Sequence, residues 1–416
     1  MSDRNDSLAA LIPQIIRTTT ASISFLSSTV MAIALMLRMR QEGEGLSSPF
    51  FRILLCLSIA DIIKSLAITI GPFAVPRDTP QALYAVGNTR SCDVQGFCIN
   101  ASGTIIPMYT FLLCIYFLMR VKYGMSREVF SKKIERYGHA IILIWNLICG
   151  LYAIFNGYIN AATFGTTCTI ISLPTSCDAD DCIRGKDAGK LLFLTAGIPV
   201  MISHAGMLLS LFTLTYQVFA DRKRTLTLTD IAYKKQMLIQ SCLYTFGLIF
   251  TYSFGYVALF VSLVRPHPIP IWINIVYAIT WPIGGLINIL IYTRPKIIIT
   301  RTRQPELSWM KAFSSVILAG AEVPDDCHDD VPAENLQTDK GRSIDVDIED
   351  NSSRGSALKF FMNREKLVAV CEVSSMPNPI ESLPWSEQVL QSSLSIEKHE
   401  ESEHRTYLNY SNKRYT

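Results

Sequence analysis

The sequence is poor in charge and in the residue patterns of enzymes. Of its 416 residues, 18% are charged, whereas soluble domains hold about a quarter. The six histidines are scattered, and there is no metal-ligand spacing, no Ser–His–Asp set and no glycine-rich phosphate loop. These absences argue against an ordinary soluble enzyme. We expect no catalytic activity, no cofactor, no metal and no nucleic-acid partner.

The charge that is present divides the chain into two parts. Residues 1–304 hold 27 Lys and Arg against 15 Asp and Glu, and residues 305–416 hold 11 against 20. An apolar, basic body is therefore followed by a polar, acidic tail that is too poor in apolar residues to fold. The sequence predicts four regions: an extracellular N-terminus (1–17), a seven-span domain (18–304), an amphipathic interfacial helix (305–319) and a disordered cytoplasmic tail (320–416).

Seven stretches are long and apolar enough to cross a bilayer, which takes roughly 20 residues of helix. They are Thr18–Leu37, Phe51–Val75, Gln95–Met119, His139–Ala161, Leu191–Ala220, Met237–Val264 and Ile271–Thr293. The pattern predicts an all-α membrane protein, a seven-transmembrane helix bundle. Because the run Thr18–Ser22 is polar, we expect the first helix to start late at its outer end.

The positions of Lys and Arg around the spans predict the orientation. Eighteen lie in the loops after the first, third and fifth spans or just after the seventh span. Eight lie on the other side, which carries the N-terminus. Positive residues concentrate on the cytosolic side, so we expect the N-terminus outside and the tail in the cytosol. Residues 1–10 do not read as a cleavable signal peptide, and we expect the first span to direct insertion of a multi-pass plasma-membrane protein.

Four of the eleven cysteines fall on the predicted outer side: Cys92, Cys168, Cys177 and Cys182. An even set on the oxidising side predicts two disulfides, for which three pairings exist. The short separation favours Cys177 with Cys182, which leaves Cys92 for Cys168. Spacing alone does not fix this connectivity.

Two charged residues lie in the middle of a predicted span. Asp61 and Lys64 are three residues apart and therefore share a helix face. A charge at this depth is costly unless it is paired, and either a structural ion pair or a wider polar network satisfies that need. Arg120, at the inner end of the third span, is either a lock between helices or a cation that reaches to the interface.

Two function classes remain for such a bundle: a receptor that relays an outside signal, and a small transporter. Transporters often carry internal repeats with matched broken helices, and the sequence has no such repeat. The seventh span also lacks the lysine that a retinal Schiff base of the microbial-rhodopsin kind requires.

Several short motifs are similar to motifs of a known membrane-protein superfamily. Leu57-Ser58-Ile59-Ala60-Asp61 is similar to the Leu-x-x-x-Asp of G-protein-coupled receptors, and Asn288-Ile289-Leu290-Ile291-Tyr292 to their Asn-Pro-x-x-Tyr, with Ile289 in place of proline. Cys92 and Cys168 match their usual disulfide. The chain resembles this superfamily over residues 15–300, although Met119-Arg120-Val121 stands where rhodopsin-like members have Asp-Arg-Tyr.

A narrower resemblance is to the cAMP-receptor-like and fungal nutrient-receptor group. This resemblance rests on three motifs: Cys92-Asp93-Val94-Gln95-Gly96-Phe97, Asp61-Ile62-Ile63-Lys64 and Tyr292-Thr293-Arg294-Pro295. The resemblance implies a heterotrimeric G protein at the basic inner face, beside membrane lipid, and a polar core that changes on activation. The residues assigned to this core and its inner end are Asp61, Lys64, Asn288, Tyr292 and Arg120.

We expect a small polar extracellular ligand, because the outer halves of the third, sixth and seventh spans offer hydrogen-bonding and aromatic groups with no clear charge partner. The predicted ligand-binding residues are Gln95, Asn100, Ser102, Tyr252, Tyr256, Trp272 and Asn274.

Overall fold

The computed structural model describes residues 2–41, 48–79, 82, 84–162, 166–174, 177, 182–221, 228–264 and 271–318. The predicted disordered tail (320–416) and part of the basic inner loop (222–227) lie outside these ranges. "Outer" and "inner" below follow the orientation that the Lys and Arg distribution predicts.

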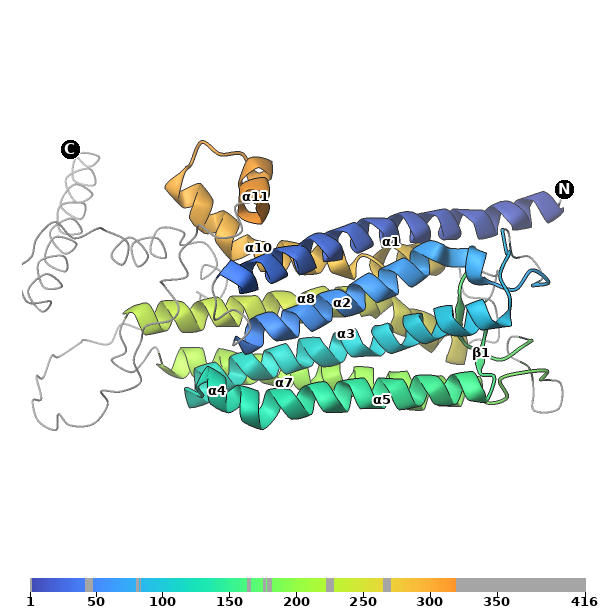
Figure 1. Cartoon of the computed structure of the whole chain (residues 1–416), viewed down its shortest axis with the longest axis horizontal. Helices are drawn as coiled ribbons and strands as arrows, with labels where there is room; N and C mark the ends of the chain where they lie inside the picture. Colours follow the sequence, from blue (N-terminus) through green and yellow to red (C-terminus); the bar gives the residue numbers. More distant parts are fainter. Residues whose placement is uncertain are drawn as a thin grey trace, which may run out of the picture. The chain divides into compact units, whose positions relative to one another are not determined.

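Long helices lie side by side in one bundle (Figure 1). Within the described residues, six helical segments are long and apolar enough to cross a membrane, and the bent pair of α9 and α10 is the seventh when it is counted as one span. The helices are α1 (Ser2–Gln41), α2 (Pro49–Ile70) with the 3-10 turn η2 (Gly71–Ala74), α3 (Thr89–Tyr123), α4 (Arg127–Phe130), the π-helical η3 (Ser131–Glu135), α5 (Arg136–Phe155), α6 (Ala188–Leu192), the π-helical η5 (Phe193–Gly197), α7 (Ile198–Asp221), α8 (Leu228–Val264), α9 (Ile271–Thr280), α10 (Gly284–Arg303) and α11 (Trp309–Leu318).

Helix α1 begins at Ser2, far before the expected start near Thr18. The hydroxyls of Thr19, Thr20 and Ser22 each donate to the carbonyl four residues earlier, at 2.8 Å. Helical Ser and Thr can satisfy their hydroxyls in this way, so the polar run does not interrupt the helix. The expectation of a late start was wrong.

Two further segments depart from a straight helix at proline. Helices α9 and α10 meet at a bend of 44° that contains Pro282, which lacks the N–H that a continuous helix needs. The π-helical η5 ends at Gly197, two residues before Pro199, and π turns occur as single insertions within longer helices.

The fourth span ends earlier than expected. Helix α5 stops at Phe155, and Gly157 takes a positive φ of 67° while Tyr158 N–H donates back to the Ala153 carbonyl, a common way to end a helix. Residues Ile159–Ala161, assigned to the span from the sequence, instead form strand β1. It pairs antiparallel with β2 (Cys168–Ile170), with Ile159 opposite Ile170.

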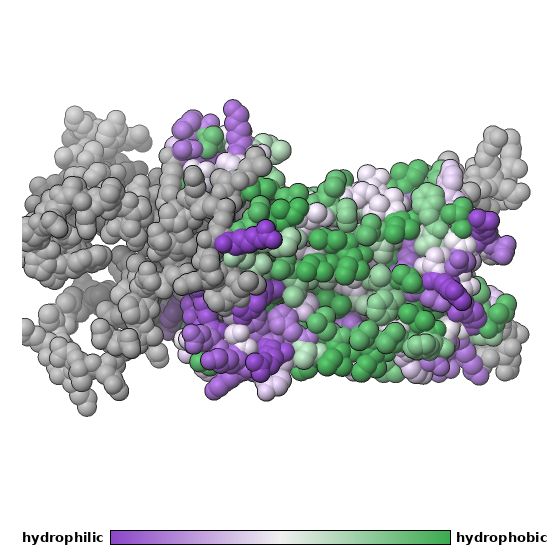
Figure 2. All heavy atoms as spheres, viewed as in Figure 1, coloured by the Kyte–Doolittle hydropathy of each residue, from purple (hydrophilic) through white to green (hydrophobic). Residues whose placement is uncertain are grey.

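The surface of the bundle is apolar across its middle. Figure 2 shows a hydrophobic band with hydrophilic residues toward both ends. On α5, side chains more than half exposed include Ile141, Leu143, Ile144, Leu147 and Ile148. Soluble monomers rarely expose an apolar patch of this extent, whereas lipid covers it at no cost. The chain is an integral, multi-pass membrane protein.

Helix α11 follows the bundle where an interfacial helix was expected at 305–319. Its Ala312 is fully buried, whereas Met310 is 75% exposed. The Arg301 guanidinium carbon lies 4.3 Å from the centre of the Trp309 ring, a cation–π contact that joins α10 to α11. Its position at the membrane surface stays a prediction.

Candidate functional site

A charged pair lies in the centre of the bundle. Asp61 and Lys64 are both on α2, their side chains are each 1% exposed, and the Lys64 Nζ lies 3.1 Å from Asp61 Oδ1. Three residues along a helix place them on one face. Their mutual attraction offsets part of the cost of removing both charges from water.

The pair extends to a second helix. Asn288, on α10, donates a hydrogen bond from Nδ2 to Asp61 Oδ2 at 2.7 Å. Asp61 Oδ1 has the Lys64 ion pair but no hydrogen bond of good geometry within the described part of the chain. Asp61, Lys64 and Asn288 are therefore in contact, and one oxygen of the Asp61 carboxylate is incompletely satisfied.

Two glycines of α10 lie beside this network and beside α1. A Cβ at Gly284 would lie 3.4 Å from Lys64 Nζ and 3.6 Å from Asp61 Oδ1. A Cβ at Gly285 would overlap the Ser28 hydroxyl of α1, and the Gly285 N–H donates to Ser24 Oγ at 2.9 Å. Gly285 therefore has no room for a side chain where α10 packs against α1, whereas a Cβ at Gly284 would fit beside Lys64 and Asp61.

The predicted inner residues Tyr292 and Arg120 lie apart from this pair. Tyr292 is buried on α10, and Lys296 Nζ lies 5.3 Å from its ring centre. Arg120, at the inner end of α3, donates from Nε and Nη2 to the Tyr233 hydroxyl of α8, each at 3.3 Å, and from Nη1 to the Met125 carbonyl at 3.2 Å. Arg120 thus joins α3 to α8.

A second contact closes the inner ends of α7 and α8. Lys234 Nζ donates to Asp221 Oδ2 at 2.7 Å, with side-chain exposures of 21% and 6%. Gln217 donates to the other carboxylate oxygen at 3.2 Å. The sequence did not single out Asp221, because its partner lies across an inner loop and no motif marks the pair.

A third inner cluster joins α2, η3, α5 and α3. Arg52 donates from Nε to Glu135 Oε1 at 2.7 Å and from Nη2 to Ser131 Oγ at 2.9 Å. His139 contacts the same Glu135 at 3.4 Å through Nε2 and the Tyr109 hydroxyl at 3.0 Å through Nδ1. Sequence reasoning missed this cluster also, since Arg52 and Tyr109 are far in the chain from Ser131, Glu135 and His139.

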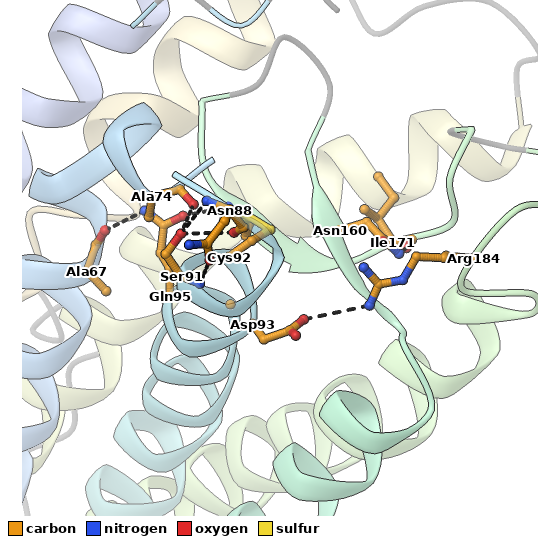
Figure 3. The surroundings of a disulfide bond; sticks show 12 residues. Ala67, Ala74, Asn88, Ser91, Cys92, Asp93, Gln95, Asn160, Ile171 and Arg184 are labelled. Atoms are coloured by element: carbon orange, nitrogen blue, oxygen red, sulfur yellow. Dashed lines mark hydrogen bonds and ion pairs between the residues drawn. A yellow bond between two sulfur atoms is a disulfide. The ribbon is translucent and has the colours of Figure 1, made fainter. Parts of the chain in front are cut away.

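At the outer end, disulfides join Cys92 to Cys168 and Cys177 to Cys182. Figure 3 shows the first of these beside Gln95, with the Asp93 carboxylate facing Arg184. The Asp93–Arg184 distance is 3.8 Å. The disulfide pairing expected from the sequence is the one in the structure, and it holds the β1–β2 hairpin against α3.

Gln95 is part of the same outer assembly. Its amide nitrogen donates to the carbonyls of Ala67 and Gly71 at 2.9 and 2.7 Å, and its oxygen accepts from the Cys168 N–H at 2.9 Å (Figure 3). One buried side chain thus ties α2, α3 and β2 together. Its polar groups are occupied by backbone, which does not leave them available to a ligand.

The neighbouring residues of the Cys92–Phe97 motif have structural roles as well. Any Cβ at Gly96 would overlap Ile159 of β1, and any Cβ at Gly150 of α5 would overlap the Phe97 ring. Asn100 donates to the Gly96 carbonyl at 2.6 Å and accepts from Thr169 Oγ1 at 3.1 Å. The motif packs α3 against the hairpin and against α5.

The remaining predicted ligand residues fall into different environments. Tyr252 is buried and donates to the Gly103 carbonyl at 2.6 Å, and the Tyr256 hydroxyl lies 3.2 Å from His204 Nδ1. His204 Nε2 is buried with no hydrogen bond inside the described ranges. Ser102 is buried, Asn274 is half-buried and Trp272 is 57% exposed.

Comparison with known proteins identifies the fold of the chain. No protein-family model matches the sequence, and no curated protein matches it significantly. Among solved structures 250 chains match, and squid rhodopsin aligns over 76% of this chain and 92% of its own, with a TM-score of 0.51 at 13% sequence identity. The chain has the seven-helix fold of squid rhodopsin.

This fold agrees with the wider resemblance found in the motifs. At 13% identity the likeness to squid rhodopsin concerns the fold alone. It does not favour the transporter alternative. The narrower resemblance to the cAMP-receptor-like and fungal nutrient-receptor group is not supported by these comparisons.

Proposed function

We propose that the protein is a cell-surface receptor that binds a small extracellular ligand and activates a heterotrimeric G protein. The observation that carries the proposal is the buried Asp61–Lys64–Asn288 network inside a receptor-type bundle. Ionisable residues at mid-membrane are costly and are most often functional. A network that joins two helices can also be rearranged when those helices move.

The inner contacts support a resting arrangement. Arg120 with Tyr233 and Asp221 with Lys234 hold the inner ends of α3, α7 and α8 together. A ligand that binds the open arrangement better than the closed one shifts the population toward it. Opening at these contacts would expose the basic inner face to a G-protein helix.

Weakening an inner contact is therefore expected to raise basal activity. Asp221→Asn removes the charge partner of Lys234, and a partly exposed pair contributes about 1 kcal/mol, which shifts an equilibrium about fivefold. The measurement is the rate of nucleotide exchange on purified G-protein α subunits, driven by the full-length protein in nanodiscs without ligand.

Asp187→Asn is the matched control. Asp187 forms an ion pair of the same 2.7 Å length with Lys190, but at the exposed outer surface, and its positive φ of 61° suits Asn. This variant should leave the exchange rate unchanged. Failure of both the wild type and Asp221→Asn to accelerate exchange on any α subunit, together with solute counterflow in liposomes, would favour a transporter instead.

A further inference from the structure

A column of stacked side chains runs from the outer part of α1 to the charged pair. The Arg17 guanidinium carbon lies 5.7 Å from the centre of the Tyr277 ring. Tyr277 stacks on Trp281 with ring centres 5.6 Å apart and an interplanar angle of 23°. Lys64 Nζ lies 5.9 Å from the centre of the Trp281 ring, and Lys64 contacts Asp61.

Each link in this column has a physical basis. Aromatic faces carry negative potential, so a cation is favoured at both ends of the Tyr277–Trp281 stack. The two rings are four residues apart, and Trp281 sits at the bend between α9 and α10. Gly255 of α8 leaves room for Tyr277, because a Cβ there would lie only 3.2 Å from the ring.

Arg17, at the outer end of the column, has no acidic partner within the described segments. The Arg17 side chain donates to Thr166 Oγ1 at 3.3 Å and lies over Tyr277, but no carboxylate within the described segments forms an ion pair with it. In contrast, Arg52, Lys64 and Lys234 each have one. Arg17 also lies toward the outer end of a candidate membrane span, Leu11–Arg40, and a cation held within a bilayer without an anion is costly.

We infer that Arg17 binds an acidic group of the ligand, a carboxylate or a phosphate, and that the Tyr277–Trp281 stack transmits its occupancy to the Asp61–Lys64 pair. Guanidinium groups bind both kinds of anion through charge-assisted hydrogen bonds. The inference deepens the proposed receptor function by giving the ligand a negative charge, which the predicted ligand residues did not require.

Anion binding to the purified full-length protein tests this directly. The protein is reconstituted in zwitterionic phosphatidylcholine nanodiscs and titrated with succinate and, separately, with inorganic phosphate, with NaCl holding the ionic strength constant. Calorimetry gives Kd, and tryptophan emission reports on the stack. The two titrations distinguish a carboxylate site from a phosphate site.

Wild-type protein should bind at least one of the two anions. Arg17→Gln should weaken that binding about 10- to 100-fold, the loss of one hydrogen bond to a charged group. Arg77→Gln is the matched control, because Arg77 is an outer arginine that donates only to the Val86 carbonyl among the contacts described. Trp281→Phe should still bind the anion but lose the change in emission.

Equal binding by wild type and Arg17→Gln would overturn the inference. So would the absence of binding of both anions to folded wild-type protein, or an emission change that survives in Trp281→Phe. None of these measurements uses a G protein. A failure of nucleotide exchange would therefore count against the proposed function and leave the anion site standing.

Discussion

Lys64→Met is expected to lower the free energy of unfolding by about 3–5 kcal/mol, the usual cost of removing one partner of a buried pair. Asp61 would keep its hydrogen bond from Asn288, but its charge would remain 1% exposed with no cation beside it. Thermal and denaturant unfolding of the purified protein in one detergent measures the change.

The double variant Asp61→Asn with Lys64→Met separates charge from packing. It removes both charges at once, and replacing a whole buried ion pair is often close to neutral. We expect it to recover most of the stability that Lys64→Met loses. A double variant no more stable than Lys64→Met would mean that the loss comes from the Lys64 contact with the Trp281 ring and not from an unpaired carboxylate.

Cys92→Ala is expected to produce the second large effect. The Cys92–Cys168 bond closes a separation of 76 residues, and in the chain-entropy account a loop of this size contributes about 4 kcal/mol of stability. Its loss also leaves the Gln95 hydrogen bond to Cys168 without the covalent link beside it. Surface expression and the unfolding temperature of the purified protein should both fall.

Cys177→Ala is the corresponding control. The Cys177–Cys182 bond closes a separation of only 5 residues, for which the same account gives about 2 kcal/mol. Mass mapping of peptides confirms which thiols are free in each variant. An equal loss of stability in the two variants, or no loss in Cys92→Ala, would show that the Cys92–Cys168 disulfide does not anchor the hairpin.

The helical bundle was largely predictable because a bilayer demands long apolar runs, and those runs are local in the sequence. Asp61 and Lys64 were recognisable for the same reason, as charges within such a run. The hairpin was not, since Ile159 and Ala161 continue the apolar residues at the end of α5 and a single Asn160 between them does not mark a strand. Only the turn at Gly157 separates the two.

The site was less predictable because its contacts join residues distant in sequence. Asn288 could be placed near Asp61 by resemblance, but Arg120 with Tyr233 and Arg52 with Glu135 have no local signal. Gln95 and Asn100 show the reverse relation between sequence and structure. Their polarity suggested a ligand, whereas their hydrogen-bonding groups contact the backbone and the hairpin.

The central claim is that Asp61 and Asn288 act as one switch coupled to a G protein. The most direct test is nucleotide exchange on a G-protein α subunit, per folded molecule, for wild type, Asp61→Asn, Asn288→Ala and the double variant. Because the two side chains are 2.7 Å apart, we expect each single variant to change basal exchange and the double variant to be non-additive. Strictly additive effects, or exchange that none of the four proteins accelerates, would contradict the claim.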